Sequence, residues 1–179
     1  HLDETDRFNI IRFGSSVEML FQDHAPCAKG PLGDARKLLD RLEADLGGTE
    51  LRSALRAAFR THREGRLHDI LLITDGEVYE NDAFYEEAER SGCRIFVIGV
   101  GCAVSEGLLR RLSKATRGMA EFITPNEDMA EKIVRHFQRM SVQAMNAEIV
   151  WPQKPDWVWP QKDAMLFQGD TTVFFARFA

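Results

Sequence analysis

The feature that most constrains the fold is the apolar run at residues 70–73, which leads into Asp75 and Gly76 in the stretch ILLITDGE. A strand that is apolar on both faces is typical of a parallel sheet covered by helices on each side. Residues 94–100 (RIFVIGV) repeat this pattern, and amphipathic segments separate the two runs. Strands and helices that alternate with short connections predict an α/β fold: a doubly wound, mostly parallel sheet with helices on both faces.

Five segments with apolar residues at helical spacing supply the predicted helices, at residues 34–46, 50–58, 82–91, 106–116 and 129–140. Asp34 is the expected N-cap of the first helix, and Ala35, Leu38, Leu39 and Leu42 are expected on its inward face. Because Gly47 and Gly48 follow, the same helix is predicted to end there.

A β-hairpin is predicted before these helices. The apolar runs at 8–13 and 17–21 flank Gly14-Ser15-Ser16, which is a turn signal. Prolines and glycines between residues 26 and 33 then predict a loop. A weaker strand is expected at residues 119–123.

The composition changes after residue 141. All three tryptophans and three of the six prolines lie in residues 142–179, where a Gln-Gly-Asp turn precedes a predicted strand at 171–178. We therefore expect an α/β domain over residues 1–141 and a β-rich appendage over residues 142–179. Trp151, Trp157 and Trp159 either pack the appendage or anchor a partner, since aromatic side chains are enriched in interface cores.

Charge, cysteines and histidines argue against several classes of function. A net charge of −5 argues against general nucleic-acid binding. No apolar run approaches the roughly 20 residues of a membrane span. The three cysteines form no Cys-x-x-Cys pair, so they are expected to be reduced thiols, which favours the cytoplasm. A periplasmic or extracellular location remains open for a full-length protein.

Catalysis is not predicted. The five histidines are scattered, with no spacing typical of a zinc site or a catalytic triad. The sequence contains no Gly-x-Gly-x-x-Gly after a first strand and no phosphate-binding Gly-x-x-x-x-Gly-Lys-Ser/Thr.

Asp75 and Thr49 are the two candidate ligand-binding residues. Ligands of open parallel sheets bind beyond the carboxyl ends of the strands, which is where Asp75 lies. Its carboxylate either binds a hard cation or makes a strand-ending turn with Gly76. Thr49 lies where a helix begins, so its hydroxyl either caps that helix or provides a neutral oxygen ligand at the same edge.

Four stretches together resemble a von Willebrand factor type A domain: DRFNIIRFGSSVEMLF (6–21), LGGTELRSAL (46–55), HDILLITDGE (68–77) and RIFVIGVG (94–101). The resemblance extends to the subgroup similar to inter-alpha-trypsin inhibitor heavy chains, in which a β-rich segment follows the domain. Such domains hold Mg²⁺ or Mn²⁺ at a metal-ion-dependent adhesion site and bind partner proteins through it. The resemblance implies that Thr49 and Asp75 are metal ligands and that a partner carboxylate completes the metal shell.

The sequence departs from this family at its principal ligands. The family's first strand ends in Asp-x-Ser-x-Ser, which occurs nowhere in this chain, and Ser15 and Ser16 in the hairpin turn are poor substitutes. Residues 2–6 look like the end of the helix that follows the first strand. We therefore expect a fragment of a longer protein that begins after that strand, with metal binding weak or absent in this chain.

The absent strand would lie between the strands at 8–13 and 70–73, leaving two unpaired edges. Three outcomes are open: the two strands close up, another chain donates a strand and creates an oligomer, or an upstream segment fills the place.

The favoured function is therefore a non-enzymatic protein–protein interaction module with a partial metal site. The alternative is a metal-independent scaffold or assembly domain that uses its surface and its aromatic C-terminal segment. Sensitivity of partner binding to EDTA or to the loss of Asp75 distinguishes the two.

Overall fold

The computed structural model describes residues 2–42, 50–62, 65–75, 81–101, 104–124, 129–140, 145–146, 149–159, 165–166, 171 and 173–178. The chain divides into two compact units, His1–Lys132 and Ile133–Ala179. Within the described ranges, no helix is long and apolar enough to cross a membrane.

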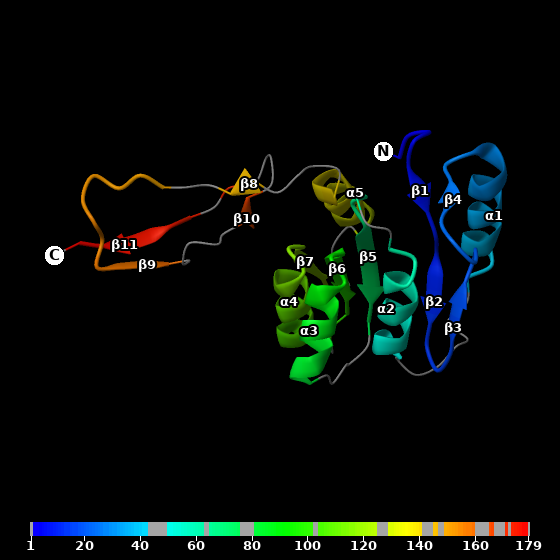
Figure 1. Ribbon diagram of the computed structural model, residues 1–179, viewed down its shortest axis with the longest axis horizontal. Coiled ribbons are helices and arrows are strands. Elements are labelled where there is room, and N and C mark those ends of the chain that lie inside the picture. The colour runs from blue at the N-terminus through cyan, green and yellow to red at the C-terminus, as the bar shows by residue number, and fades with distance from the viewer. Residues whose placement is uncertain are drawn as a thin grey trace. The chain divides into compact units, whose positions relative to one another are not determined.

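A three-stranded parallel sheet lies at the centre of the first unit, in the order β5–β6–β7 (Figure 1). The strands are β5 (Asp69–Thr74), β6 (Arg94–Val100) and β7 (Ala120–Ile123). The middle strand β6 is buried over six of its seven residues, as its continuous apolar run predicts. Because Asp69 is paired with Arg94 and Val100 with Ile123, the carboxyl ends of the strands meet at one edge of the sheet.

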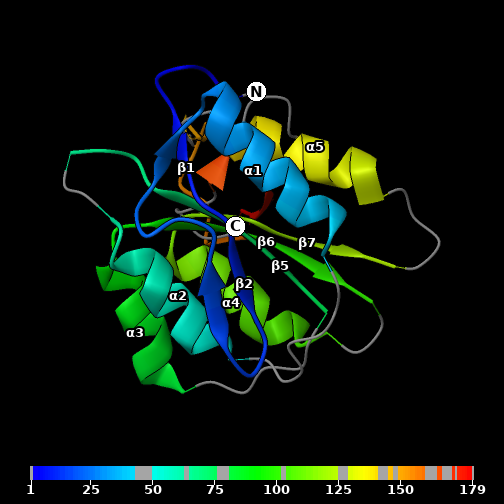
Figure 2. The same cartoon turned by 90° about the vertical axis from the view of Figure 1, so that its right-hand side faces the viewer.

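Three helices pack on this sheet, and Figure 2 shows them on one side of it. They are α2 (Leu51–Phe59), α3 (Asp82–Arg90) and α4 (Glu106–Ala115). Their apolar faces meet the sheet in one core, which contains Leu51, Leu55, Leu72, Phe84, Tyr85, Ala88, Ile95, Val97, Leu109 and Leu112. The helices predicted near residues 50, 82 and 106 are therefore confirmed.

The helix α3 begins at a side-chain cap. The Asn81 Oδ1 accepts a hydrogen bond from the Phe84 N–H at 3.3 Å, which satisfies one of the free amides of the first turn. A further helix, α5 (Met129–Met140), confirms the last predicted helix; it begins in the first unit and ends in the second.

The first predicted helix is wrong at its start. The helix α1 (Lys29–Asp40) begins before Asp34, which lies inside it and not at its N-cap. Pro31 is tolerated because it lies in the first turn, where the missing N–H would have no intrahelical partner. The helix also ends at Asp40, before its predicted end. Of the predicted inward face, Ala35 is buried, whereas Leu39 and Leu42 are 55% and 52% exposed.

The predicted hairpin is confirmed in its centre, where β2 (Ile11–Phe13) pairs antiparallel with β3 (Val17–Met19). Phe8 belongs instead to β1 (Arg7–Phe8), which pairs with β4 (Ala25–Pro26), at the start of the stretch predicted as a loop. Asn9 separates β1 from β2. Its side-chain amide donates to the Phe21 carbonyl at 2.8 Å and accepts from the Phe21 N–H at 3.1 Å. These two bonds take the place of backbone hydrogen bonds between the strands.

Among the described residues, β2 and β5 do not pair, so the hairpin and the parallel sheet are separate. The two strands therefore do not close up on each other. The helix α2 contacts both β2 and β3, and its Leu51 packs in the core with Leu72 of β5. Contrary to the prediction, β5 is not buried on both faces: Leu72 and Thr74 are buried, whereas Ile73 is 45% exposed.

The second unit contains two small antiparallel pairs. In the first, β9 (Trp157–Trp159) pairs with β11 (Phe175–Arg177), and in the second β8 (Met145–Asn146) pairs with β10 (Met165–Leu166). The strand predicted at 171–178 is thus present over Phe175–Arg177, in the second half of the predicted range. Trp157 and Trp159 are 48% and 56% exposed.

Candidate functional site

Asp75 lies at the carboxyl edge of the parallel sheet, directly after β5, where the sequence predicts it. The preceding Thr74 is buried, whereas Asp75 is exposed. No hydrogen bond or ion pair joins the Asp75 carboxylate to another described residue. Thr49 and Gly76 lie outside the described residues. The pairing of Thr49 with Asp75 therefore stays a prediction.

Two glycines allow the backbone to pack closely at this edge. A Cβ on Gly99 would lie 2.6 Å from the Phe122 ring and 2.9 Å from Val104, so a larger residue would force these side chains to move. Gly101 has a φ of +108°, a conformation that other residues rarely adopt, and its N–H donates to the Ile123 carbonyl at 3.0 Å. Glycine thus lets β6 approach its neighbours beside the exposed carboxylate.

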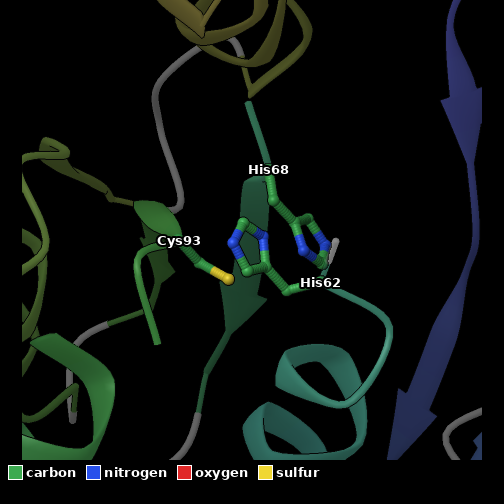
Figure 3. A group of neighbouring side chains, drawn as sticks. All are labelled: His62, His68 and Cys93. Atoms are coloured by element: carbon green, nitrogen blue, oxygen red, sulfur yellow. The ribbon is translucent and has the colours of Figure 1, made fainter. Parts of the chain in front are cut away.

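A second group of polar side chains meets at the opposite, amino edge of the sheet (Figure 3). His62 follows α2, His68 precedes β5 and Cys93 precedes β6. One ligand atom from each residue, a ring nitrogen or the Cys93 sulfur, lies within 4.8 Å of the other two. The rings of His62 and His68 stack with their centroids 5.5 Å apart and their planes 15° from parallel.

The environment of this cluster favours the uncharged forms of His68 and Cys93. Burial, and then the charges of His24 and His62, lower the pKa of His68 from 6.5 to about 4. Burial raises the pKa of the Cys93 thiol, which donates to the Ser91 carbonyl at 3.7 Å. The Nδ1 atoms of His62 and His68 are buried and have no hydrogen-bond partner among the described residues.

The interpretation of the histidines as scattered is wrong for three of the five. His62 and His68 form the cluster, and the ring of His24 contacts His68 edge-on at a centroid distance of 4.8 Å. Spacing rules for metal sites cannot detect this group, because its members come from the ends of one helix and two strands. A signal does exist: His68 and Cys93 each precede a strand start, and parallel pairing of Asp69 with Arg94 brings them together.

A partly buried ion pair fixes the two strand starts beside the cluster. The Arg94 guanidinium binds the Asp69 carboxylate twice, with Nε 2.7 Å from Oδ1 and a terminal nitrogen 2.5 Å from Oδ2. The two side chains are only 10% and 20% exposed. Such bidentate pairs set geometry as well as energy, so the backbone that carries His68 and Cys93 is held in register.

These features define an α/β domain with a Rossmann-like parallel sheet and an acidic side chain at its carboxyl edge. The family model of the von Willebrand factor type A domain matches residues 1–122. The chain belongs to this family, whose members are typically protein-interaction modules. The predictions of the fold class and of the family are confirmed.

Relatives that share this domain are much longer than the chain. A von Willebrand factor A domain-containing protein of Dictyostelium discoideum is 33% identical over 137 residues, which cover 75% of this chain and 15% of that protein. The human von Willebrand factor A domain-containing protein 5A is 28% identical over 178 residues, which cover 95% of this chain and 22% of that protein. The chain therefore matches a small part of these relatives, and the more specific subgroup similar to inter-alpha-trypsin inhibitor heavy chains stays a prediction.

Solved structures support the same fold. A von Willebrand factor type A protein from Catenulispora acidiphila superposes with a TM-score of 0.65 at 20% identity, covering 78% of this chain and 34% of that one. Proximal thread matrix protein 1 from the mussel byssus, with a zinc-occupied metal-ion-dependent adhesion site, gives a TM-score of 0.52 at 19% identity, covering 72% and 33%. At these identities the likeness concerns the fold alone.

Proposed function

We propose that this chain is a protein-interaction module whose carboxyl sheet edge binds Mg²⁺ or Mn²⁺ through Asp75 and Thr49. A carboxylate of the partner protein completes the metal shell. Carboxylate, hydroxyl and water oxygens suit magnesium, which keeps several waters and is usually held by only one or two protein carboxylates. The exposed Asp75, directly after β5 and its buried Thr74 in a domain of this family, is the observation that carries the proposal.

The direction of α2 supports the pairing of Thr49 with Asp75. His62, which follows α2, stacks on His68 at the amino edge of the sheet, so the helix ends at that edge. Its first residues therefore lie toward the opposite edge, where Asp75 is. Glu50, the neighbour of Thr49, donates its N–H to the Gly14 carbonyl at 2.9 Å, which ties the start of α2 to the hairpin turn.

A Mn²⁺ titration followed by electron paramagnetic resonance tests the metal site. Asp75→Ala should abolish the bound Mn²⁺, because it removes the one carboxylate of the proposed pair. The matched control is Asp34→Ala, which also removes an exposed carboxylate but lies in α1. Equal Mn²⁺ affinity of wild type and Asp75→Ala would show that the carboxyl edge is not the site.

The second candidate function is a metal-independent scaffold that uses the second unit. The observation in its favour is the exposed aromatic surface of the β9–β11 pair, where the rings of Trp159 and Phe175 lie 6.2 Å apart. Affinity capture of the same partner in Mg²⁺ and in EDTA separates the two functions. Loss in EDTA and with Asp75→Ala supports the metal site, whereas loss only with Trp157→Ala and Trp159→Ala supports the scaffold.

We also propose that a further strand, from residues that precede His1 in the natural protein, pairs with the free edge of β5. That edge has no strand partner among the described residues, and Ile73 beside it is exposed. Hydrogen exchange tests the proposal. The β5 amides that face this edge should exchange quickly in this chain and become protected when about 50 preceding residues of the gene are included, whereas the amides that face β6 should be protected in both. Unchanged exchange would contradict it.

A further inference from the structure

We propose that His62, His68 and Cys93 form a second metal site, selective for Zn²⁺, at the amino edge of the sheet. The site is separate from the carboxyl edge that carries Asp75, because His68 and Asp75 lie at opposite ends of β5. The six residues of β5 rise by about 3.3 Å each, which places the two edges roughly 20 Å apart. The proposal is therefore independent of the proposed interaction function.

The candidate ligand atoms of the three side chains are nearly as close together as the ligands of a bound zinc ion. Zinc binds histidine nitrogen at about 2.0–2.1 Å and cysteine sulfur at about 2.3 Å, so tetrahedral ligands lie roughly 3.3–3.7 Å apart. The three candidate atoms lie within 4.8 Å of one another, so binding requires a closure of about 1 Å and the rotation of one ring out of the stack, so that both nitrogens face the ion. Figure 3 shows the Cys93 sulfur directed toward the His62 ring, which is stacked on the His68 ring.

The unpartnered ring nitrogens are a second, independent indication of a ligand. Polar groups buried without a hydrogen bond are unfavourable, and native structures rarely keep two of them side by side. The Nδ1 atoms of His62 and His68 are both in this condition among the described residues. A metal ion bound through the Nδ1 atoms would relieve their unfavourable burial, which gives the cluster a chemical reason to bind one.

The donor set determines which ion binds. One thiolate and two imidazoles suit zinc, whereas magnesium and calcium require oxygen ligands. On binding, the Cys93 thiol transfers its proton to solvent and the sulfur becomes the anionic ligand, while each imidazole binds as the neutral ring. Three protein ligands leave the fourth tetrahedral position for a water molecule.

The backbone around the site is built to hold these ligands in place. The Arg94–Asp69 ion pair locks the residues next to Cys93 and His68. Gly92, with a φ of +71°, turns the chain into β6, and a Cβ there would lie 3.6 Å from the Nε2 of His62. The ligands thus come from three segment ends that tertiary structure already fixes, so bound zinc would join the end of α2 to the starts of β5 and β6.

Titration of the reduced, metal-free protein with Co²⁺, followed by displacement with Zn²⁺, tests the proposal. We expect one equivalent of Co²⁺ with a thiolate-to-cobalt charge-transfer absorption that Zn²⁺ removes. Cys93→Ser should eliminate that absorption, and His68→Ala should weaken zinc binding by at least 10–100-fold, the scale known for lost second-shell partners. Isothermal titration in buffers of different ionisation enthalpy should show proton release.

Two control variants exclude other origins of the signal. A variant with Cys27→Ser and Cys102→Ser keeps Cys93 as its only cysteine and should bind as the wild type does. Asp75→Ala should also leave zinc binding unchanged, so a failure of the carboxyl-edge site does not affect this result. Absence of the thiolate absorption in the wild type, or its loss in the variant with only Cys93, would overturn the proposal.

Discussion

Gly118 permits the close approach of β7 to β6, and Gly118→Ala should destabilise the first unit strongly. A Cβ at this position would lie 1.9 Å from the carbonyl oxygen of Ile95 and 2.5 Å from its carbon. Real Cβ atoms stay beyond 3.0 Å of such neighbours, so the two backbones would have to separate by about 1 Å. The Val97 N–H, now 2.7 Å from the Met119 carbonyl oxygen, would then move beyond hydrogen-bonding distance.

The size of the destabilisation follows from the lost hydrogen bond and from the overpacking. Loss of one backbone hydrogen bond lowers the free energy of unfolding by about 1 kcal/mol, and overpacking lowers it by about 1–3 kcal/mol. We therefore expect a loss of about 2–4 kcal/mol, which lowers the Tm by roughly 5–15 °C in a domain of this size. Urea unfolding followed by far-UV circular dichroism measures it, with a lower midpoint at unchanged slope.

A matched substitution and a second probe sharpen this test. Gly107→Ala introduces the same methyl group in α4, where no atom lies within 4 Å, and should stabilise the protein slightly by removing a helical glycine. All three tryptophans lie after residue 150, so their fluorescence reports the second unit and should keep its midpoint. Similar midpoints for Gly118→Ala and Gly107→Ala would refute the argument from close packing.

Three further predictions concern the ion pair, the core and the effect of pH. Arg94→Met should lower the free energy of unfolding by about 2–4 kcal/mol, because it leaves the Asp69 carboxylate, which is only 20% exposed, without its partner. Adding Asp69→Leu to this variant should restore most of the loss. Equal losses in the single and the double variant would contradict this. In urea unfolding, Leu112→Ala should cost about 2–5 kcal/mol because Leu112 is 0% exposed, whereas Leu67→Ala at 71% exposure should change stability by less than about 0.5 kcal/mol. In EDTA, the free energy of unfolding should fall as the pH drops from 6.5 toward 4, because burial lowers the pKa of His68 to about 4 and the unfolded chain takes up the proton first. The loss should stay below about 3 kcal/mol because water still screens the ring. A free energy of unfolding that does not change over this pH range would contradict the prediction.

The parts of the fold that sequence predicts are those decided by local pattern. The continuous apolar run of β6 and the helical spacing of α3 and α4 needed no tertiary information, and all three elements lie where expected. The start of α1 was not predictable in this way, because Gly30 and Pro31 also occur in loops. The position of Pro31 in a first turn is favourable only once the helix direction is known.

The two candidate sites differ in predictability for the same reason. Asp75 is recognisable because it closely follows an apolar run, which is a relation between neighbours in sequence. The group formed by His62, His68 and Cys93 depends on the register of β5 with β6 and on where α2 ends, and neither is encoded in spacing. The exposure of Ile73 is not predictable from sequence for the same reason, since an apolar run does not show which side of a strand has a neighbour.

The separation of the two edges also determines how the sites can influence each other. At roughly 20 Å, the charge of an ion at one edge is largely screened at the other, because the Debye length is about 8–10 Å at physiological salt. A mechanical link would have to pass through α2 or β5, and both are held in one core through Leu51, Leu55 and Leu72. Packed cores of this kind do not deform gradually. Metal binding at the two proposed sites should therefore be energetically independent, which is why Asp75→Ala is a valid control for the proposed zinc site and Cys93→Ser for the proposed magnesium site.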